Sequence, residues 1–269
     1  NAGKNPVLFD VNAPESSEAL RRLLRTADLL IEDIGLLDGL LPWQGVHALN
    51  PRLTAVSVSP FGLSGPYANY PADDLTLWAW SGLAWSSPGV PDTPRDLENE
   101  PPLSPAGVSV AGIIGGAVTA VAALAALAYG DGRGRRVEVS EHEALAALNY
   151  HPIAQYEYLR SLWPRGPNII ARQPNCYLPC KDGWLVLVAM SPQHWGGLME
   201  AMDGPDWAQN PAFADAPSRA ANWDALEPLL TEWTAARTGR EITETLQARG
   251  LPVYWSSTLE EAVTSPQVI

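Results

Sequence analysis

Two adjacent carboxylates, Asp73 and Asp74, are the residues whose type and spacing best suit acid–base chemistry. A carboxylate at a substrate site can act as a general base or as a nucleophile. The pair also stands directly before a short apolar segment, Leu75–Gly82, where Asp residues cap a helix and interact favourably with its amino end. Capping is the favoured interpretation, and a catalytic role for Asp73 is the alternative.

Histidines supply the second group of candidates. His142 lies between Glu141 and Glu143 at the predicted start of a helix, where it could act as a base. A solvated surface histidine is the favoured interpretation there. His194 precedes Trp195 at the start of a predicted helical region and is kept as a candidate catalytic residue.

Metal, disulfide and polyanion-binding chemistry have little support. Cys176 and Cys180 are four residues apart without a set of His or acidic ligands, so structural thiols and no metal site are predicted. A formal net charge of −13 argues against general binding to nucleic acid or to an anionic membrane. The apolar run at 113–129 is expected to be too short and too rich in Gly and Ala to span a bilayer, so a cytoplasmic protein is predicted.

The elements that must position these residues alternate between strand and helix. Strands are predicted over Asn5–Val11, Leu29–Ile31 and Leu53–Val58, with helices over Pro14–Arg25 and Leu37–Leu49 between them. Such alternation favours a doubly wound α/β sheet. A short helix is predicted to begin at the acidic pair and to continue to residue 83.

The segment 106–148 carries the most structural information. Its apolar stretch, Ile113–Tyr129, predicts a helix that is buried on all sides and ends at a glycine turn. A cluster of arginines follows the turn, where solvated charge is favoured over phosphate binding. Val137–Val139 then predicts a strand, and Ser140 with Glu143 three residues later is typical of a capping box that opens the next helix.

The pattern changes in the last third of the chain. Two apolar runs around an Asp-Gly turn predict a hairpin over Asn175–Met190, followed by helices within Pro192–Ala248 and a strand at Leu251–Tyr254. The sequence therefore predicts a Rossmann-like large domain over residues 1–160 and a smaller α+β domain over residues 161–269.

Short motifs spread in order along nearly the whole chain indicate its relationships. They are Ala27–Ile34, Asn50–Leu53, Ser59–Tyr67, Val110–Gly112, Gly132–Ser140 and Tyr177–Gly183. Together they resemble the class III CoA-transferase family (CaiB/BaiF), which also contains the 2-methylacyl-CoA racemases. The resemblance implies a protein that acts on or binds acyl-CoA thioesters as substrate or ligand, with no covalently bound cofactor. It also implies that the family's first strand–helix pair and its C-terminal segment are missing here.

The most informative departure from the family is at Gly112, which matches the family's catalytic Asp. In the transferases that Asp forms a covalent intermediate with CoA, and glycine has no side chain to do so. The racemases use a His, an Asp and a Glu, whose positions correspond to Asp73, Gly112 and Ser191. All three differ, so a racemase is disfavoured. His194 lies near the third of these positions.

The resemblance also implies positions that contact CoA: Asp33, Ile34, Asp73, Asp74, Arg165 and Arg172. The acidic residues among them stand near the place expected for a diphosphate, where an additional carboxylate is unfavourable. The two arginines flank a loop that lies near the substrate in the family. A contact with phosphate or carboxylate and ordinary solvated charge both stay open for them.

Two functional interpretations follow. In the first, the chain acts on acyl-CoA as a CoA-transferase without the usual Asp. In the second, it is a non-catalytic structural or CoA-binding half of a tandem or hetero-oligomeric transferase. An engineered change at Gly112 is a third alternative. Family members form interlocked dimers, so a homodimer or a second family domain or subunit is the expected partner.

Overall fold

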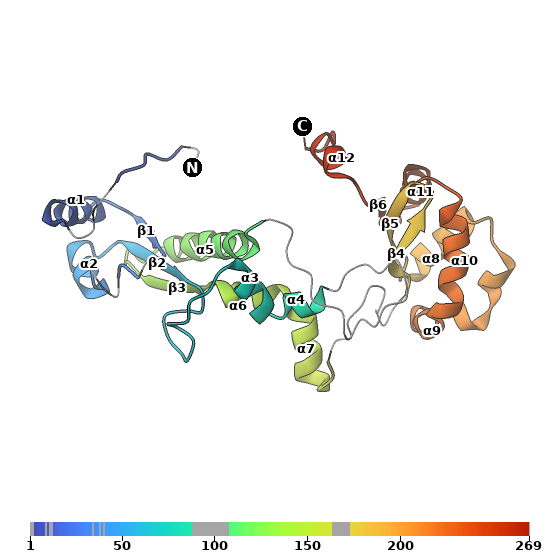
Figure 1. Ribbon diagram of the computed structural model, residues 1–269, viewed down its shortest axis with the longest axis horizontal. Helices are drawn as coiled ribbons and strands as arrows, with labels where there is room; N and C mark the ends of the chain where they lie inside the picture. Colours follow the sequence, from blue (N-terminus) through green and yellow to red (C-terminus); the bar gives the residue numbers. More distant parts are fainter. Residues whose placement is uncertain are drawn as a thin grey trace. The chain divides into compact units, whose positions relative to one another are not determined.

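The structure of the protein is a computed structural model that describes residues 3–87, 108–162 and 173–268, apart from residues 9, 11, 12, 34, 38 and 40. The chain divides into two compact units, Asn1–Arg165 and Gly166–Ile269. Each unit has its own three-stranded sheet and its own core (Figure 1).

The first unit is built on a parallel sheet. Its strands β1 (Leu29–Glu32), β2 (Thr54–Ser59) and β3 (Arg136–Ser140) lie in that order, with Ile31 opposite Val56. Because all three strands run in one direction, their carboxyl ends share one edge of the sheet. These strands confirm the ones predicted from the sequence, with boundaries that differ by one or two residues.

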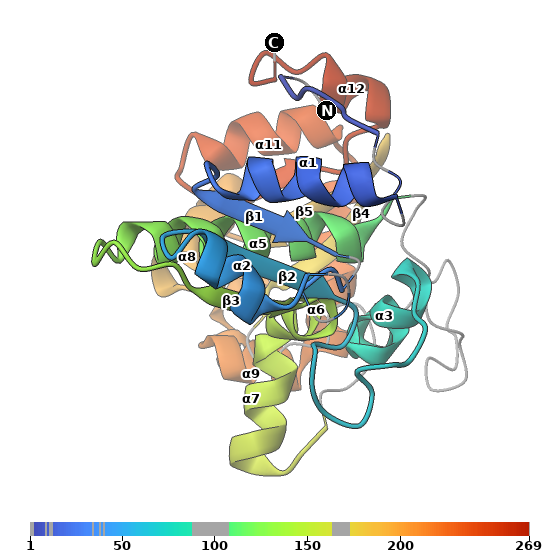
Figure 2. The ribbon, with the colours of Figure 1, turned by 90° about the vertical axis from the view of Figure 1, so that its left-hand side faces the viewer.

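Helices cover both faces of this sheet (Figure 2). α1 (Pro14–Leu24) and α2 (Trp43–Leu49) pack on the face that carries Ala55, whereas α5 (Val110–Ala128) packs on the face that carries Val56. Successive residues of a strand point to opposite faces, so the middle of β2 is buried on both sides. The predicted α/β fold with helices on both faces is confirmed.

α5 is only partly buried, and the prediction of a helix buried on all sides is wrong. The side chains facing the sheet and α6 are small, but Val121 and Leu124 on the opposite face are 68% and 66% exposed. An entirely apolar composition does not specify which neighbour covers each face. Among the described residues α5 is also the helix that is long and apolar enough to cross a membrane, by length and composition only, so the expectation that this run is too short is wrong.

Three other predicted elements of the first unit differ. The described residues between 5 and 11 form no strand. In the first half of the helix predicted over Leu37–Leu49, the described residues 37, 39, 41 and 42 are not helical, and Leu41 lies in the core. The helix predicted from the acidic pair divides into α3 (Asp74–Trp80) and α4 (Leu83–Ser86), because Gly82 between them adopts a left-handed φ of 82°.

The end of β3 leads directly into α6 (Glu141–Leu148), which α7 (Tyr150–Leu159) follows. The Ser140 hydroxyl accepts a hydrogen bond from the Glu143 N–H at 3.2 Å, so the predicted cap is confirmed, whereas the reciprocal bond of a capping box is not found here among the described residues. The cap fixes the first turn of α6 at the carboxyl edge of the sheet.

The second unit has an antiparallel sheet of β4 (Asn175–Cys180), β5 (Gly183–Val188) and β6 (Val253–Trp255). Cys180 pairs with Gly183, so the predicted hairpin and its turn are confirmed. The predicted helical region is also confirmed. Its elements are α8 (Pro192–Ala201), the 3-10 helices η1 (Asp206–Gln209) and η2 (Pro211–Phe213), α9 (Ala216–Ala221), α10 (Trp223–Ala235) and α11 (Gly239–Gln247), with α12 (Leu259–Val263) after β6.

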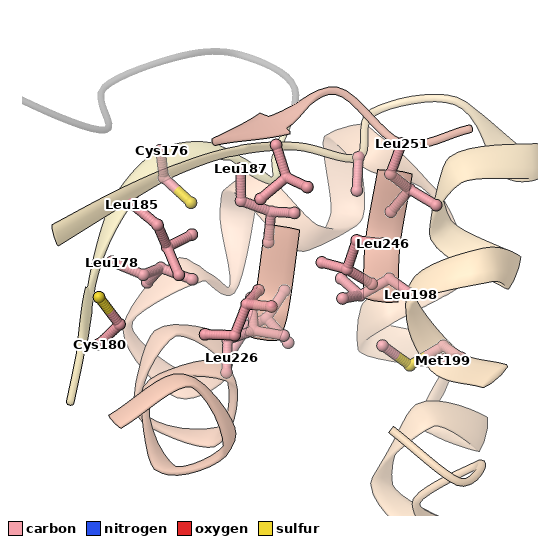
Figure 3. Packing of buried hydrophobic residues seen from close by; sticks show 14 of the residues in the cluster. Cys176, Leu178, Cys180, Leu185, Leu187, Leu198, Met199, Leu226, Leu246 and Leu251 are labelled. Carbon is pink, nitrogen blue, oxygen red and sulfur yellow. The ribbon is translucent and has the colours of Figure 1, made fainter. Parts of the chain in front are cut away.

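One continuous core fills the second unit (Figure 3). Leu178 of β4, Leu226 of α10 and Leu246 of α11 are fully buried in it. Cys176 and Cys180 are free thiols that belong to the same core, which agrees with the structural role predicted for them. Burial raises the pKa of the Cys176 thiol, so it stays protonated and unreactive.

Arg219 is a buried cation of the second unit that the sequence did not single out. Its Nε donates to the Gln173 carbonyl at 2.9 Å and its Nη1 donates to the Phe213 carbonyl at 3.0 Å. The guanidinium carbon lies 4.2 Å from the centre of the Trp195 ring. Arg219 therefore joins three segments of this unit through hydrogen bonds and a cation–π contact.

Candidate functional site

A cleft of about 600 Å³ opens at the carboxyl edge of the parallel sheet. Its walls are the last residues of β1 and β2, the first half of α5 and the first residue of α6. Open α/β sheets bind their ligands at this edge. The cleft brings together Asp33, Gly112 and Glu141, which are far apart in the sequence.

Gly112 lies in the first turn of α5 and lines the cleft. Among the described residues, a Cβ atom at this position would meet only Ser109, whose hydroxyl oxygen would be 2.8 Å away. Rotation of this hydroxyl, which would break its hydrogen bond to Asp74, would leave room for a side chain at Gly112. That Gly112 is the substituted position of a catalytic Asp stays a prediction.

The two adjacent carboxylates hold the starts of two different helices. The hydroxyl and the N–H of Thr76 donate to Asp73 Oδ1 at 2.5 and 2.8 Å, and these bonds hold the pKa of Asp73 below its usual value. Asp74 Oδ1 accepts from the Ala111 N–H at 2.7 Å and from the Ser109 hydroxyl at 3.1 Å. The capping interpretation is therefore observed at α3, and a catalytic role for Asp73 stays a prediction.

Glu141 and Glu32 are cleft carboxylates that were not predicted as site residues, and Glu141 stood out in the sequence only as a neighbour of His142. Burial raises the pKa of Glu141, and the negative charges of Asp74 and Asp33 raise it further. A carboxylate in a cleft with a raised pKa is typical of a functional site. The signal available in the sequence was a Glu directly after a strand and its helix cap.

Polar atoms are also buried in the walls of the cleft. Glu32 is 6% exposed; its Oε2 accepts from the Leu36 N–H at 2.8 Å, and its Oε1 has no hydrogen-bond partner among the described residues. The hydroxyl of Thr119, on the cleft side of α5, likewise lacks a partner there. Burying such atoms without partners costs free energy, so they are available to a ligand group or to water.

The predicted CoA-contact residues are only partly described. Asp33 lies in the wall of the cleft, and a contact between Asp33 and CoA stays a prediction. Asp73 caps α3, Asp74 accepts a hydrogen bond from the first turn of α5, and neither lines the cleft, although the charge of Asp74 reaches Glu141. Three of the predicted residues lie outside the described part of the chain: Ile34, Arg165 and Arg172.

The candidate histidines have local structural contacts. His142 is half-buried, its N–H donates to the Pro60 carbonyl at 2.9 Å, and its ring lies 5.7 Å from that of Phe61. The expectation of a solvated histidine is therefore wrong, because the chain before α3 folds back over the start of α6. In the second unit, the His194 N–H donates to the Ser191 hydroxyl at 3.1 Å, so Ser191 caps α8. A catalytic role for His194 stays a prediction.

The arginines after α5 lie at the amino end of β3, opposite the edge that carries the cleft. Arg135 forms an ion pair with Asp131 at 2.7 Å and stacks on Tyr129. This cluster therefore does not contribute to the cleft.

Aromatic side chains gather beside the cleft, between β2 and α3. The rings of Phe61 and Trp80 meet edge to face at 5.3 Å, and Tyr67 lies 5.0 Å from Trp80 and 5.2 Å from Tyr70. The cluster links the loop after β2 to α3. Within residues 3–87, 108–162 and 173–268, no group of His, Cys, Asp and Glu is arranged to hold a metal ion.

Known proteins resemble the chain along its whole length. It is 28% identical over 273 residues to the Succinyl-CoA--D-citramalate CoA-transferase of Chloroflexus aurantiacus, which covers 99% of this chain and 66% of that protein. It is 33% identical over 222 residues to subunit BbsE of the succinyl-CoA:(R)-benzylsuccinate CoA-transferase of Thauera aromatica, covering 80% and 52%. The chain thus spans about two thirds or less of the length of these relatives.

Solved structures show the same fold. A CaiB/BaiF family protein from Brucella suis superimposes with a TM-score of 0.78 at 26% identity, covering 99% of this chain and 70% of the other. Rv3272 from Mycobacterium tuberculosis gives a TM-score of 0.83 at 25% identity, covering 99% and 69%. The sequence profile of CoA-transferase family III matches residues 1–269. The chain therefore belongs to CoA-transferase family III, the CaiB/BaiF family.

Proposed function

We propose that the cleft at the carboxyl edge of the parallel sheet binds an acyl-CoA thioester and that the protein transfers CoA between carboxylic acids. The observation that carries this proposal is an open cleft, lined by Gly112, at the edge where α/β sheets bind ligands; the resemblance predicts that Gly112 takes the place of the family's catalytic Asp. Relatives named as CoA-transferases support the reaction class.

The glycines of α5 suit this role. Gly112 and Gly116 both line the cleft, and among the described residues nothing lies within 4 Å of a Cβ built on Gly116. Glycine at these positions lets a flat thioester group approach the helix backbone closely. The reacting carbonyl would then lie near the walls that hold Asp33 and Glu141.

A second candidate function is a non-catalytic, CoA-binding half of a larger transferase. The missing side chain at Gly112 favours it. The exposed apolar face of α5, with Val121 and Leu124, supports a partner that covers this face in either function. A second copy, a second family domain or another subunit would serve, and a cytoplasmic location stays a prediction.

The proposal is tested with the full-length protein and a panel of acyl-CoA donors and carboxylate acceptors. Binding of acetyl-CoA and succinyl-CoA is measured by calorimetry, and exchange with succinate, glutarate and acetate is followed by mass spectrometry. We expect binding and exchange. Binding without exchange supports the non-catalytic alternative, whereas no binding of any CoA thioester overturns the proposal.

The variant Gly112→Asp tests the position directly. Gly196→Asp is the matched control, because Gly196 is also helical and, like Gly116, has nothing within 4 Å of its Cβ position among the described residues. If the cleft is the site, Gly112→Asp changes the exchange rate or the affinity for CoA thioester and Gly196→Asp changes neither. Equal effects of the two variants contradict the assignment of the cleft.

A further inference from the structure

Glu141 occupies a special position on the chain. It is the first residue of α6, directly after the cap Ser140, and it lines the cleft together with Gly112 and Gly116. Its backbone is fixed by the cap and by the end of β3, which are both rigid elements. A reactive group that must meet a substrate with constant geometry is best placed on such elements.

Gly115 lets the Glu141 side chain lie directly against α5. A Cβ built on Gly115 would lie 2.9 Å from Glu141 Cγ and 3.3 Å from Glu141 Oε1. Any larger residue would displace the Glu141 side chain. The two glycines therefore differ in what they contact. Gly115 leaves room for the Glu141 side chain, and Gly116 borders open space in the cleft.

The carboxylate of Glu141 is not used for helix capping. In α11, the Glu241 carboxylate accepts hydrogen bonds from the N–H and hydroxyl of Thr238. No such bond and no ion pair is found for Glu141 within the described ranges 3–87, 108–162 and 173–268. Its nearest charges are carboxylates, which with burial raise its pKa. The charged form of the Glu141 side chain thus has little stabilisation from the described residues. Such a carboxylate is more typical of a functional site than of a structural role.

We propose that Glu141 is the nucleophile of this cleft, acting where Gly112 has no side chain to react. This inference rests on the proposed function, since it needs an acyl-CoA thioester in the cleft. Partial desolvation leaves a carboxylate more basic and more nucleophilic than it is in water.

The reaction balances without a redox partner. A Glu141 oxygen attacks the thioester carbonyl, the C–S bond breaks, and CoA leaves as the thiolate, which gives a mixed anhydride. The thiolate then attacks the glutamyl carbonyl, the bond between that carbonyl carbon and the bridging oxygen breaks, and the donor leaves as a carboxylate that keeps this oxygen. The glutamyl-CoA thioester reacts with the acceptor carboxylate by the same two steps in reverse, which restores Glu141.

Trapping identifies the reacting residue in the unmodified full-length protein. The protein is incubated with acetyl-CoA, treated with borohydride to reduce an acyl-enzyme thioester to an alcohol, and digested for mass spectrometry. We expect the modification on the peptide that carries Glu141. Modification of another carboxylate, such as Asp73, overturns the inference, and this experiment does not depend on whether a variant folds.

Variants give the second test. Glu141→Gln is expected to lower the exchange rate by more than about 100-fold while acetyl-CoA still binds. Glu143→Gln is the matched control, because Glu143 is in the same helical turn but is exposed; it should exchange at the original rate. Gly112→Asp added to Glu141→Gln should restore part of the exchange.

The outcomes separate the two proposals. If the protein binds acetyl-CoA and Glu141→Gln exchanges normally, the inference about Glu141 fails and the proposed function stands. If the unmodified protein binds no CoA thioester, the proposed function itself fails.

Discussion

The two units of this chain bury their apolar side chains in different ways. The second unit has one continuous core, to which the hairpin, α8, α10 and α11 all contribute. The buried residues of the first unit form three smaller clusters, on the two faces of its sheet and around α3, and one side of α5 is left exposed. A unit with a continuous core needs no partner to bury its apolar side chains. An exposed apolar helix face, such as that of α5, is typical of a surface that another chain or segment covers.

The features that suggest a functional site are also distributed unequally between the two units. The first unit holds the cleft, the buried oxygens that have no partner among the described residues, and the carboxylate with a raised pKa. The polar side chains singled out in the second unit, Ser191 and Arg219, have structural partners. The comparison teaches that the proposed site lies in the unit whose core is divided and partly exposed, whereas the unit with the continuous core is the more self-contained of the two.

The sharpest test of the comparison is a pair of leucine substitutions. Leu226→Ala, at a position of 0% exposure in the second unit, should lower the free energy of unfolding by about 3 kcal/mol. Leu124→Ala, on the exposed face of α5, should lower it by less than about 0.5 kcal/mol in a monomer. Chemical denaturation with hydrogen exchange of each unit measures both. A large loss for Leu124→Ala would show that α5 is covered in solution.

The next largest effect on the free energy of unfolding is expected from removing the buried cation, Arg219. Arg219→Gln should lower the free energy of unfolding by about 2 kcal/mol, because it removes charge-assisted donors from two buried carbonyls. Hydrogen exchange should increase in the second unit alone. If exchange in the first unit rises equally, the two units do not unfold independently and the comparison breaks.

The glycines of α5 should respond in opposite directions. Gly116→Ala should stabilise the helix by about 1 kcal/mol, because nothing lies within 4 Å of its Cβ position among the described residues. Gly115→Ala should lose this gain, because the new methyl group meets Glu141 Cγ at 2.9 Å. Thermal unfolding of both variants measures the difference. If both substitutions stabilise equally, Glu141 does not lie where the structure places it.

The smallest expected effect concerns pH. The folded-state pKa of Glu141 is raised, so the folded protein binds this proton more tightly than the unfolded chain does. Ionisation of Glu141 therefore costs stability above its folded pKa, and the cost disappears as the pH falls below the unfolded value. Glu141→Gln should raise the melting temperature by about 1–2 °C at pH 7, and the difference from the original protein should vanish in acid. A variant that melts lower at pH 7 would show that Glu141 stabilises the fold.

Local patterns predicted much of this fold. The parallel strands, the hairpin at Lys181–Gly183 and the cap at Ser140 depend on residues that are neighbours in sequence, and all were found. The burial of α5 could not be predicted, because its composition is apolar on every side and only the tertiary structure decides which side is covered. The position of Leu41 in the core could not be predicted either, because it depends on tertiary contacts.

The site was predictable only where a motif marked it. Gly112 and Asp33 were found through the resemblance to the family, and both lie in the cleft. Glu141 was missed because its significance comes from Gly115 and from Asp74, which are distant in sequence. The role of Asp74 at the start of α5 was missed for the same reason, since an acidic residue before a helix predicts a cap for that helix only.

The bonds of Asp74 make α3 and the first turn of α5 move as one body. α3 in turn is held by the aromatic cluster through Trp80. A change in the bulk of Phe61 or Tyr67 would therefore shift Gly112 without altering any residue that lines the cleft beside it. Under the proposed function, substitutions in the aromatic cluster could change which acyl groups fit, while the residues that line the cleft stay the same.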